Sequence, residues 1–296
     1  MFNYLPVYII YDSYLDTVTD MKENKKMLIN GTDYKLIFLD SNAIREITNN
    51  TFSSGKGFLE NYLAKDIPYI PCFSIYNVIE LKPNIEGFQK FIDYFNIVPC
   101  LMFYFSRTII QEEVNYYLNN EPFMITNKIM YSFSLLNKQG NYSFSFIINE
   151  ILTKMERLID DEIKRLSSIA SEWEEQRINK GTEKVSQTDI MNLYRYDEEK
   201  IIRKDLNSWG KRLGEFDINQ LPALRIMSYS QFCRVHLTQK PIKPNDVMDI
   251  TISSIIPYVD AVITEGFQAD IYKKSKLFIT QMKDVKILTL KDIRGI

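Results

Sequence analysis

The chain has 296 residues, enough for one large domain or for a core with an insertion. Its composition, 45% hydrophobic and 25% charged, is ordinary for a globular protein, and a net charge of −2 provides no global attraction to nucleic acid. The three cysteines are dispersed and argue against a disulfide framework, and the single histidine, His236, excludes a multi-histidine metal site.

Targeting signals and common nucleotide motifs are not evident. No apolar run approaches the ~20 residues that a membrane span needs, and no basic segment precedes the apolar stretch at the N-terminus. The sequence therefore predicts neither membrane association nor a secretory signal, and we expect a cytoplasmic protein. It contains no Walker-type loop and no GxGxxG motif, so a nucleotide-cradling site has no support.

Hydrophobic periodicity divides the chain into an α/β core and a helical segment within it. Apolar residues recur at steps of three and four from Ile148 to Trp173, which indicates a long amphipathic helix, and a second helical stretch follows near 189–209. The expected parts are an N-terminal extension (1–33), a first core part (34–139), a helical insertion (140–215) and a second core part (216–296).

Strands and helices alternate in both core parts, which favours a parallel sheet with helices on both faces. The expected strands are 36–39, 67–73, 97–103, 261–264 and 285–290. The expected helices are 74–81, 88–95, 108–118, 224–237, one opened by Asp246, and 267–279.

Acidic residues fall at matching points of this pattern. Asp40 follows the apolar run of the first strand at once, where open α/β sheets bind ligands. Glu80 lies about one and a half turns into the helix that has Ser74 as its N-cap. Asp246 and Asp249, spaced i, i+3, share one face at a helix N-terminus.

Two further acids compete for a position beside the strand 261–264. Asp260 precedes this strand and Glu265 follows it, so at ~3.3 Å per residue they lie about 15 Å apart. If the strands are parallel, only Glu265 emerges at the same edge as Asp40. We therefore prefer Glu265.

Carboxylates that converge at one sheet edge repel one another unless a cation is present, and a site of oxygen ligands suits Mg²⁺ or Mn²⁺. One or two such ions activate a water and clamp the phosphate oxygens of an in-line displacement. Taken singly, Asp246 and Asp249 are explained by a helix N-terminus and Asp40 by a turn. The candidate metal ligands are Asp40, Glu80, Asp246, Asp249, Asp260 and Glu265.

The order of these features resembles the PIN-domain nucleases, especially the larger PIN-like proteins of bacteria. The resemblance is carried by LIFLDSN with Asp40, SIYNVIEL with Glu80, PNDVMD with Asp246 and Asp249, and IPYVDAVITE with Glu265. It covers 34–135 and 216–296, and the last motif is its most specific part.

The resemblance implies a three-layer α/β/α fold with a central parallel sheet and Mg²⁺- or Mn²⁺-dependent cleavage of RNA. It assigns the catalytic acids to Asp40, Glu80, Asp249 or Asp246, and Glu265, with Asp249 favoured by the apolar positions that follow it. Bacterial relatives of this type are often toxins of toxin–antitoxin pairs or anti-phage effectors. A protein partner that inhibits or activates the enzyme is therefore a further expectation.

Basic and aromatic side chains near the same edge are the expected substrate contacts, because Lys and Arg bind phosphates and aromatic rings stack on unpaired bases. The predicted contacts are Asn42, Arg45, Thr264, Lys273 and Lys274, with Lys276, Arg225, Arg234, Tyr258 and Tyr272 as further candidates.

Alternatives to a ribonuclease remain open. The acids do not distinguish RNA from DNA, so a nuclease that cuts DNA, including single-stranded DNA, is the second hypothesis. A PIN-like fold that serves as an inactive binding or assembly module is the third. A phosphohydrolase with an aspartyl nucleophile is disfavoured, because Asn42 stands where its second aspartate is needed. The sequence predicts no oligomeric state.

Overall fold

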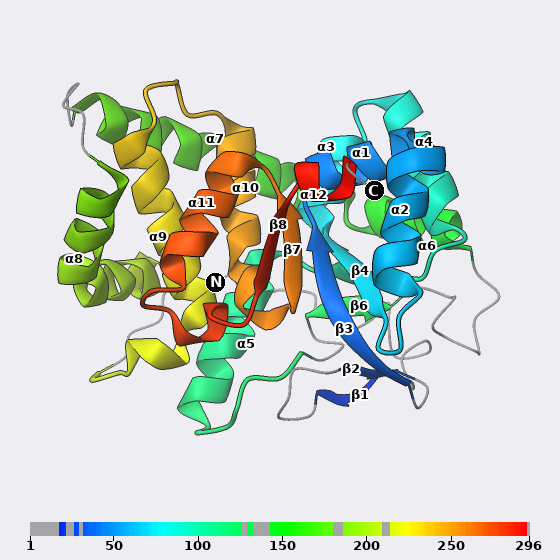
Figure 1. The fold of residues 1–296 in the computed structure, drawn as a ribbon. Coiled ribbons are helices and arrows are strands. Elements are labelled where there is room, and N and C mark those ends of the chain that lie inside the picture. Colours follow the sequence, from blue (N-terminus) through cyan, green and yellow to red (C-terminus); the bar gives the residue numbers. More distant parts are fainter. Residues whose placement is uncertain are drawn as a thin grey trace.

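The computed structural model describes residues 18–21, 27–29, 32–125, 129–132, 143–179, 186–208 and 214–294. The strands that form its central sheet are β3 (Thr32–Leu39), β4 (Tyr69–Ser74), β5 (Leu101–Phe103), β6 (Met130–Ser132), β7 (Ala261–Thr264) and β8 (Lys286–Thr289). They lie side by side in the order β8–β7–β3–β4–β5–β6 (Figure 1). The chain is thus an α/β protein.

The sheet is mixed, although the sequence predicted a parallel one. The strands from β8 to β5 are parallel, as expected, but β6 pairs antiparallel with β5. The start of β3 also pairs antiparallel with β2 (Met27–Ile29), which pairs with β1 (Val18–Met21). Residues 30–31 alone separate β2 from β3, and so short a connection suits an antiparallel pair, since parallel strands need a long crossover.

Helices cover both faces of the sheet (Figure 1). One face carries α1 (Ser41–Asn49), α2 (Lys56–Phe58), α4 (Ile85–Phe95) and α6 (Phe144–Lys154). The other carries α5 (Ser106–Leu118), α8 (Gln187–Ser208), α9 (Pro222–Leu237), α10 (Pro244–Ile252) and α11 (Gly266–Ser275). The remaining α-helices are α3 (Ile75–Leu81), α7 (Glu156–Asn179) and α12 (Lys291–Arg294).

Short irregular helices complete the described chain. The π-helical segments η2 (Thr51–Gly55) and η3 (Leu59–Leu63) flank α2. The 3-10 segments are η4 (Ile218–Gln220), η5 (Ser253–Tyr258) and η6 (Thr280–Met282). Of the described helices, none has both the length and the apolar character needed to cross a membrane.

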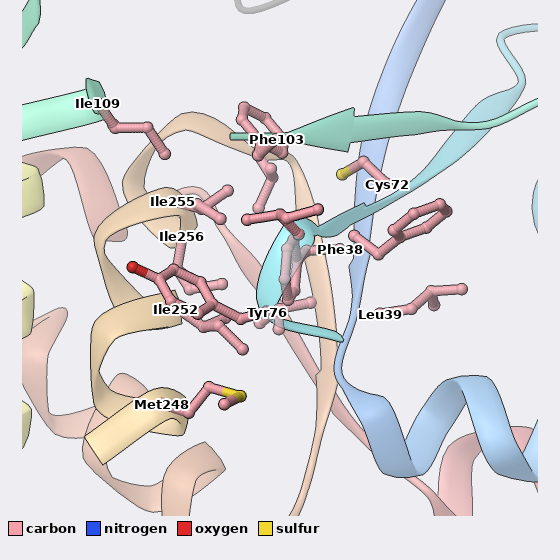
Figure 2. Close-up of a cluster of buried hydrophobic side chains, with 14 of the residues drawn as sticks. Phe38, Leu39, Cys72, Tyr76, Phe103, Ile109, Met248, Ile252, Ile255 and Ile256 are labelled. Carbon is pink, nitrogen blue, oxygen red and sulfur yellow. The ribbon is translucent and has the colours of Figure 1, made fainter. Parts of the chain in front are cut away.

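The central strand β3 is buried on both faces, since Leu36, Ile37, Phe38 and Leu39 have no exposed surface. Such a continuous apolar run is typical of a strand covered by helices on both sides. Figure 2 shows side chains of β3, β4 and β5 packed against Ile109 of α5 and against α10 and η5. This core holds α10 against the sheet and thereby fixes the helix that carries Asp249.

The long amphipathic helix predicted from Ile148 onward is divided into α6 and α7. The division falls at Met155, whose φ of −102° and ψ of 7° are not helical. Buried apolar residues continue on both sides of this break, so the periodicity does not reveal it. Helix α8 packs along α9, and α7 packs against α10 and α9, which ties the segment 140–215 to the second core part.

Candidate active site

Asp40 and Glu265 meet at the carboxyl ends of two neighbouring parallel strands. Asp40 follows β3 and Glu265 follows β7, and the Glu265 backbone N–H donates to Oδ2 of Asp40 at 3.0 Å. The chain continues from β3 to β4 on one side and from β7 to β8 on the other, so the strand order reverses here. In open α/β sheets, this switch point is the usual place for a ligand.

The carboxylate of Asp40 is held in one orientation by the backbone. Its Oδ1 accepts from the Ala43 N–H at 2.7 Å, which caps α1 in the manner preferred for aspartate. The Thr264 side chain also forms a hydrogen bond with it. Asp40 thus caps a helix, where the alternative from the sequence was a turn, and the same residue also lines the pocket.

A pocket of about 130 Å³ opens at this switch point. It is lined by polar residues from five segments that are far apart in the sequence: Asp40, Ser41, Asn42, Glu80, Arg234, Asp246, Asp249, Thr264, Glu265 and Gln268. Phe267, Tyr272 and several core side chains complete its wall. The fold thus brings together Asp40, Glu80, Asp246, Asp249 and Glu265, five of the six acids proposed from the sequence.

Glu80 reaches the pocket from a helix. Glu80 comes from α3, which begins directly after β4 and packs against α1 and α10. Ser74 occupies the N-cap position of α3, as predicted, but its hydroxyl donates to Oδ1 of Asn77 at 2.9 Å. Asn77 in turn donates to the hydroxyl of Ser41 at 2.9 Å, which joins α3 to the residue that follows Asp40.

The acids interact strongly with one another. Burial raises the pKa of Asp249 to about 8, and the charges of Glu80, Asp40 and Glu265 add to this effect. Burial also raises the pKa of Asp40 to about 6, against the lowering effect of its hydrogen bonds. Asp249 lies among these acids in the pocket, but its accessible surface is that of an exposed residue. A cation in the pocket would relieve this repulsion.

Three of the acids have polar partners at the pocket rim. Arg45 donates through Nη2 to Glu80 at 3.0 Å and through Nη1 to Asn42 at 3.0 Å, and Asn42 donates to Glu265. Asn42 and Arg45, predicted as substrate contacts, thus orient two of the acids.

The third partner is Arg234 of α9, which donates to Asp246. Asp246 also accepts from the Lys243 backbone N–H at 2.8 Å, which supports its explanation as a residue of the α10 N-terminus. Asp249, one turn further along α10, has no such bond to the helix start. Of the two candidates, Asp249 is therefore the one whose pKa is raised, first by burial and then by the charges of Glu80, Asp40 and Glu265.

The chemistry of the donor set suits a hard divalent cation, because all the acids offer oxygen and no histidine or cysteine lines the pocket. Within the described residues, no group of three or more His, Cys, Asp and Glu side chains is positioned to hold a metal ion. In this structure Glu80 accepts a hydrogen bond from Arg45, and Glu265 accepts one from Asn42. Side-chain rotation at these two positions would be needed for coordination.

Asp260, one of the candidate metal ligands, does not line the pocket that the other five acids share. It precedes β7, and its Oδ2 accepts from the Leu36 backbone N–H at 2.7 Å near the middle of β3. Its own backbone N–H donates to the Leu36 oxygen. Asp260 therefore fixes the alignment of β7 beside β3, on the opposite edge from Glu265.

Several predicted substrate contacts also lie outside the pocket. Lys273 and Lys274 are in the last turn of α11, about 10–12 Å along the helix from its start at the pocket. Lys276 follows that turn and does not line the pocket either. Their closeness to Glu265 in sequence was misleading because the helix leads away from the site.

Two further candidates have structural roles. Arg225 is only 3% exposed and forms a two-point ion pair with Glu198, through Nε at 2.7 Å and Nη2 at 3.0 Å. Tyr258 donates to the buried Glu113. Arg234 and Tyr272, in contrast, do line the pocket, and Tyr272 is nearly fully buried there.

Sequence reasoning missed Phe267 and Gln268, which line the pocket from the first turn of α11. Their position two and three residues after Glu265 was the available signal. Comparison of the chain with protein-family models, with curated proteins and with solved structures finds no match.

Proposed function

We propose that this protein is a metal-dependent nuclease that hydrolyses phosphodiester bonds of RNA at the acidic pocket. The observation that carries the proposal is the convergence of Asp40, Glu80, Asp249 and Glu265 at the switch point of the sheet. Burial and the charges of the other acids raise the pKa of Asp249, and a divalent cation would stabilise the charged form of such a group. The resemblance to PIN-domain nucleases supports the same conclusion.

The four acids would hold the ion, and Asp40 is the best prepared of them. Hydrogen bonds from the backbone N–H groups of Ala43 and Glu265 fix both of its oxygens. When bound, Mg²⁺ or Mn²⁺ would supply an activated water and neutralise the charge of the phosphate. Arg45 and Asn42 would hold Glu80 and Glu265 near the pocket until the ion binds.

The pairs at the rim also favour a second candidate, an inactive PIN-like binding or assembly module. Arg45 and Arg234 each neutralise an acid of the pocket, and a permanently neutralised site would not need a metal. The choice of RNA over DNA rests on the resemblance, as do the role of toxin or anti-phage effector and the regulatory protein partner.

The test is cleavage of labelled single-stranded RNA and single-stranded DNA by the purified protein with Mn²⁺, Mg²⁺ or EDTA. Asp40→Asn removes one ligand charge and keeps the shape of the side chain, and Asp270→Asn, an exposed position on α11, is its matched control. We expect metal-dependent cutting of RNA that Asp40→Asn abolishes and Asp270→Asn retains. Cleavage of DNA alone would favour the hypothesis of a nuclease that cuts DNA. Equal cleavage by the native protein and by Asp40→Asn would contradict both nuclease hypotheses.

A further inference from the structure

Phe267 is an aromatic side chain at the mouth of an otherwise acidic pocket. It lies in the first turn of α11, two residues after Glu265, and lines the pocket while 39% of its surface stays exposed. Core packing does not require this residue, because neighbouring positions of α11, such as Ala269 and Tyr272, already supply the buried face of the helix.

Arg234 lies over the ring of Phe267, with the guanidinium carbon 5.5 Å from the ring centroid. Among the described residues it is the only Lys or Arg that lines the pocket, and Asp246 holds it in place. A guanidinium fixed in the pocket wall is suited to bind a phosphate.

The two side chains together match the requirements of an unpaired nucleotide. A polyanion is repelled by the acids of the pocket, so its phosphate needs a cation on the wall, and Arg234 is placed to provide it. A base beside that phosphate can cover the exposed area of Phe267 by stacking, which every base can do through its π-face. Bases in a duplex are stacked on one another and are not available for this contact.

The size of the pocket suits the proposed phosphate contact. A cavity of about 130 Å³ accepts a group of the size of a phosphate.

We infer that Phe267 and Arg234 form a recognition element for single-stranded nucleic acid, in which Phe267 stacks on an unpaired base and Arg234 binds the adjoining phosphate. This inference rests on the proposed nuclease function and specifies its substrate as an unpaired strand. Phe267 acts in substrate binding and has no part in holding the metal.

The test measures binding separately from cleavage. Fluorescence anisotropy of a labelled single-stranded RNA is recorded in EDTA, beside a hairpin duplex of the same length, and 2-aminopurine in the single strand reports stacking. Phe267→Ala is expected to weaken binding of the single strand by about 5- to 100-fold and to abolish the quenching of 2-aminopurine. Phe267→Tyr is expected to retain both, and Phe52→Ala, which removes a 97% exposed phenylalanine outside the pocket, is the matched control.

Arg234→Gln gives an independent readout of phosphate binding. It should reduce the slope of log Kd against log salt concentration by about one, an effect that a purely structural residue would not produce. Thermal unfolding verifies that each variant is folded.

The outcomes separate this inference from the proposed function. If Phe267→Ala binds the single strand as tightly as the native protein, or if the native protein prefers the duplex, the recognition element is refuted while metal-dependent cleavage stands. If the native protein stacks on 2-aminopurine through Phe267 but cuts nothing, the nuclease fails and the binding element stands. If the native protein binds neither RNA in EDTA, the recognition element is refuted, and cleavage with Mn²⁺ decides the nuclease separately.

Discussion

Replacing Asp249 with asparagine is expected to stabilise the metal-free protein at alkaline pH. The pKa of Asp249 is raised to about 8 by burial and by the charges of Glu80, Asp40 and Glu265. Between about pH 4 and pH 8, the folded protein keeps a proton on this group that the unfolded chain releases. Stability present below pH 4 is therefore lost progressively as the pH rises through this window, and asparagine, which carries no charge, avoids the loss.

The magnitude follows from the size of the pKa shift and from the exposure of the side chain. A shift from 3.8 to about 8 corresponds to about 6 kcal/mol for a fully buried group. The outer surface of Asp249 touches solvent, which screens the repulsion, so we expect a gain of about 1–2 kcal/mol at pH 8. For a protein of this length, such a gain raises the Tm by roughly 2–6 °C.

The assay is thermal and urea unfolding of the native protein and of Asp249→Asn, in EDTA, from pH 4 to pH 8.5. The difference in unfolding free energy should be near zero at pH 4 and should grow toward pH 8 in favour of the variant. Asp270→Asn, on the exposed side of α11, should show no such growth. Addition of Mn²⁺ at pH 8 should stabilise the native protein more than the variant. A variant less stable than the native protein at pH 8 in EDTA would refute the reasoning.

Three further predictions concern buried polar groups outside the pocket. Glu198→Gln should lower the free energy of unfolding by about 3–5 kcal/mol in urea titrations, because Arg225 is left as an unpaired buried charge; a loss below about 1 kcal/mol would contradict this. Burial raises the pKa of Glu113 to about 7, so the contribution of this group to stability should fall as the pH rises from about 4.5 to 7. Glu113→Gln should flatten that part of the curve of unfolding free energy against pH, and an unchanged curve would contradict this prediction. Asp260→Ala should lower the free energy of unfolding by about 1–3 kcal/mol, because the hydrogen bond from the Leu36 N–H is lost, and should leave Mn²⁺ binding unchanged. Weaker Mn²⁺ binding by the folded variant would indicate that Asp260 is a metal ligand.

The central strand and the acids beside it could be predicted from the sequence, because they depend on local pattern and strand direction. The run Leu36–Leu39 is apolar without alternation, which identifies a strand covered on both faces, and this placed Asp40 at its carboxyl end. Strand direction alone separated Glu265 from Asp260. The helical spacing of Asp246 and Asp249 put both on the side that faces the pocket.

Features that depend on tertiary packing could not be predicted from the sequence. The strands β1, β2 and β6 join the sheet by antiparallel pairing, and their short sequences contain no pattern that predicts it. Lys273 was placed near the site by sequence distance, whereas α11 carries it to the far end of the helix. The pairing of Arg225 with Glu198 joins residues of α9 and α8, and no sequence pattern reveals such a contact.

The most direct test of the acidic pocket as a divalent-metal site is to measure Mn²⁺ binding to the native protein and to Asp40→Asn. Isothermal titration calorimetry gives the affinity, and a parallel electron paramagnetic resonance titration reports the free Mn²⁺. We predict saturable binding to the native protein and to Asp270→Asn, tightening from pH 6 to pH 8 as Asp40 and Asp249 lose their protons, and at least a tenfold weaker affinity for Asp40→Asn. Equal binding by Asp40→Asn, or no binding by the native protein at pH 8, would contradict the metal site and with it the proposed nuclease.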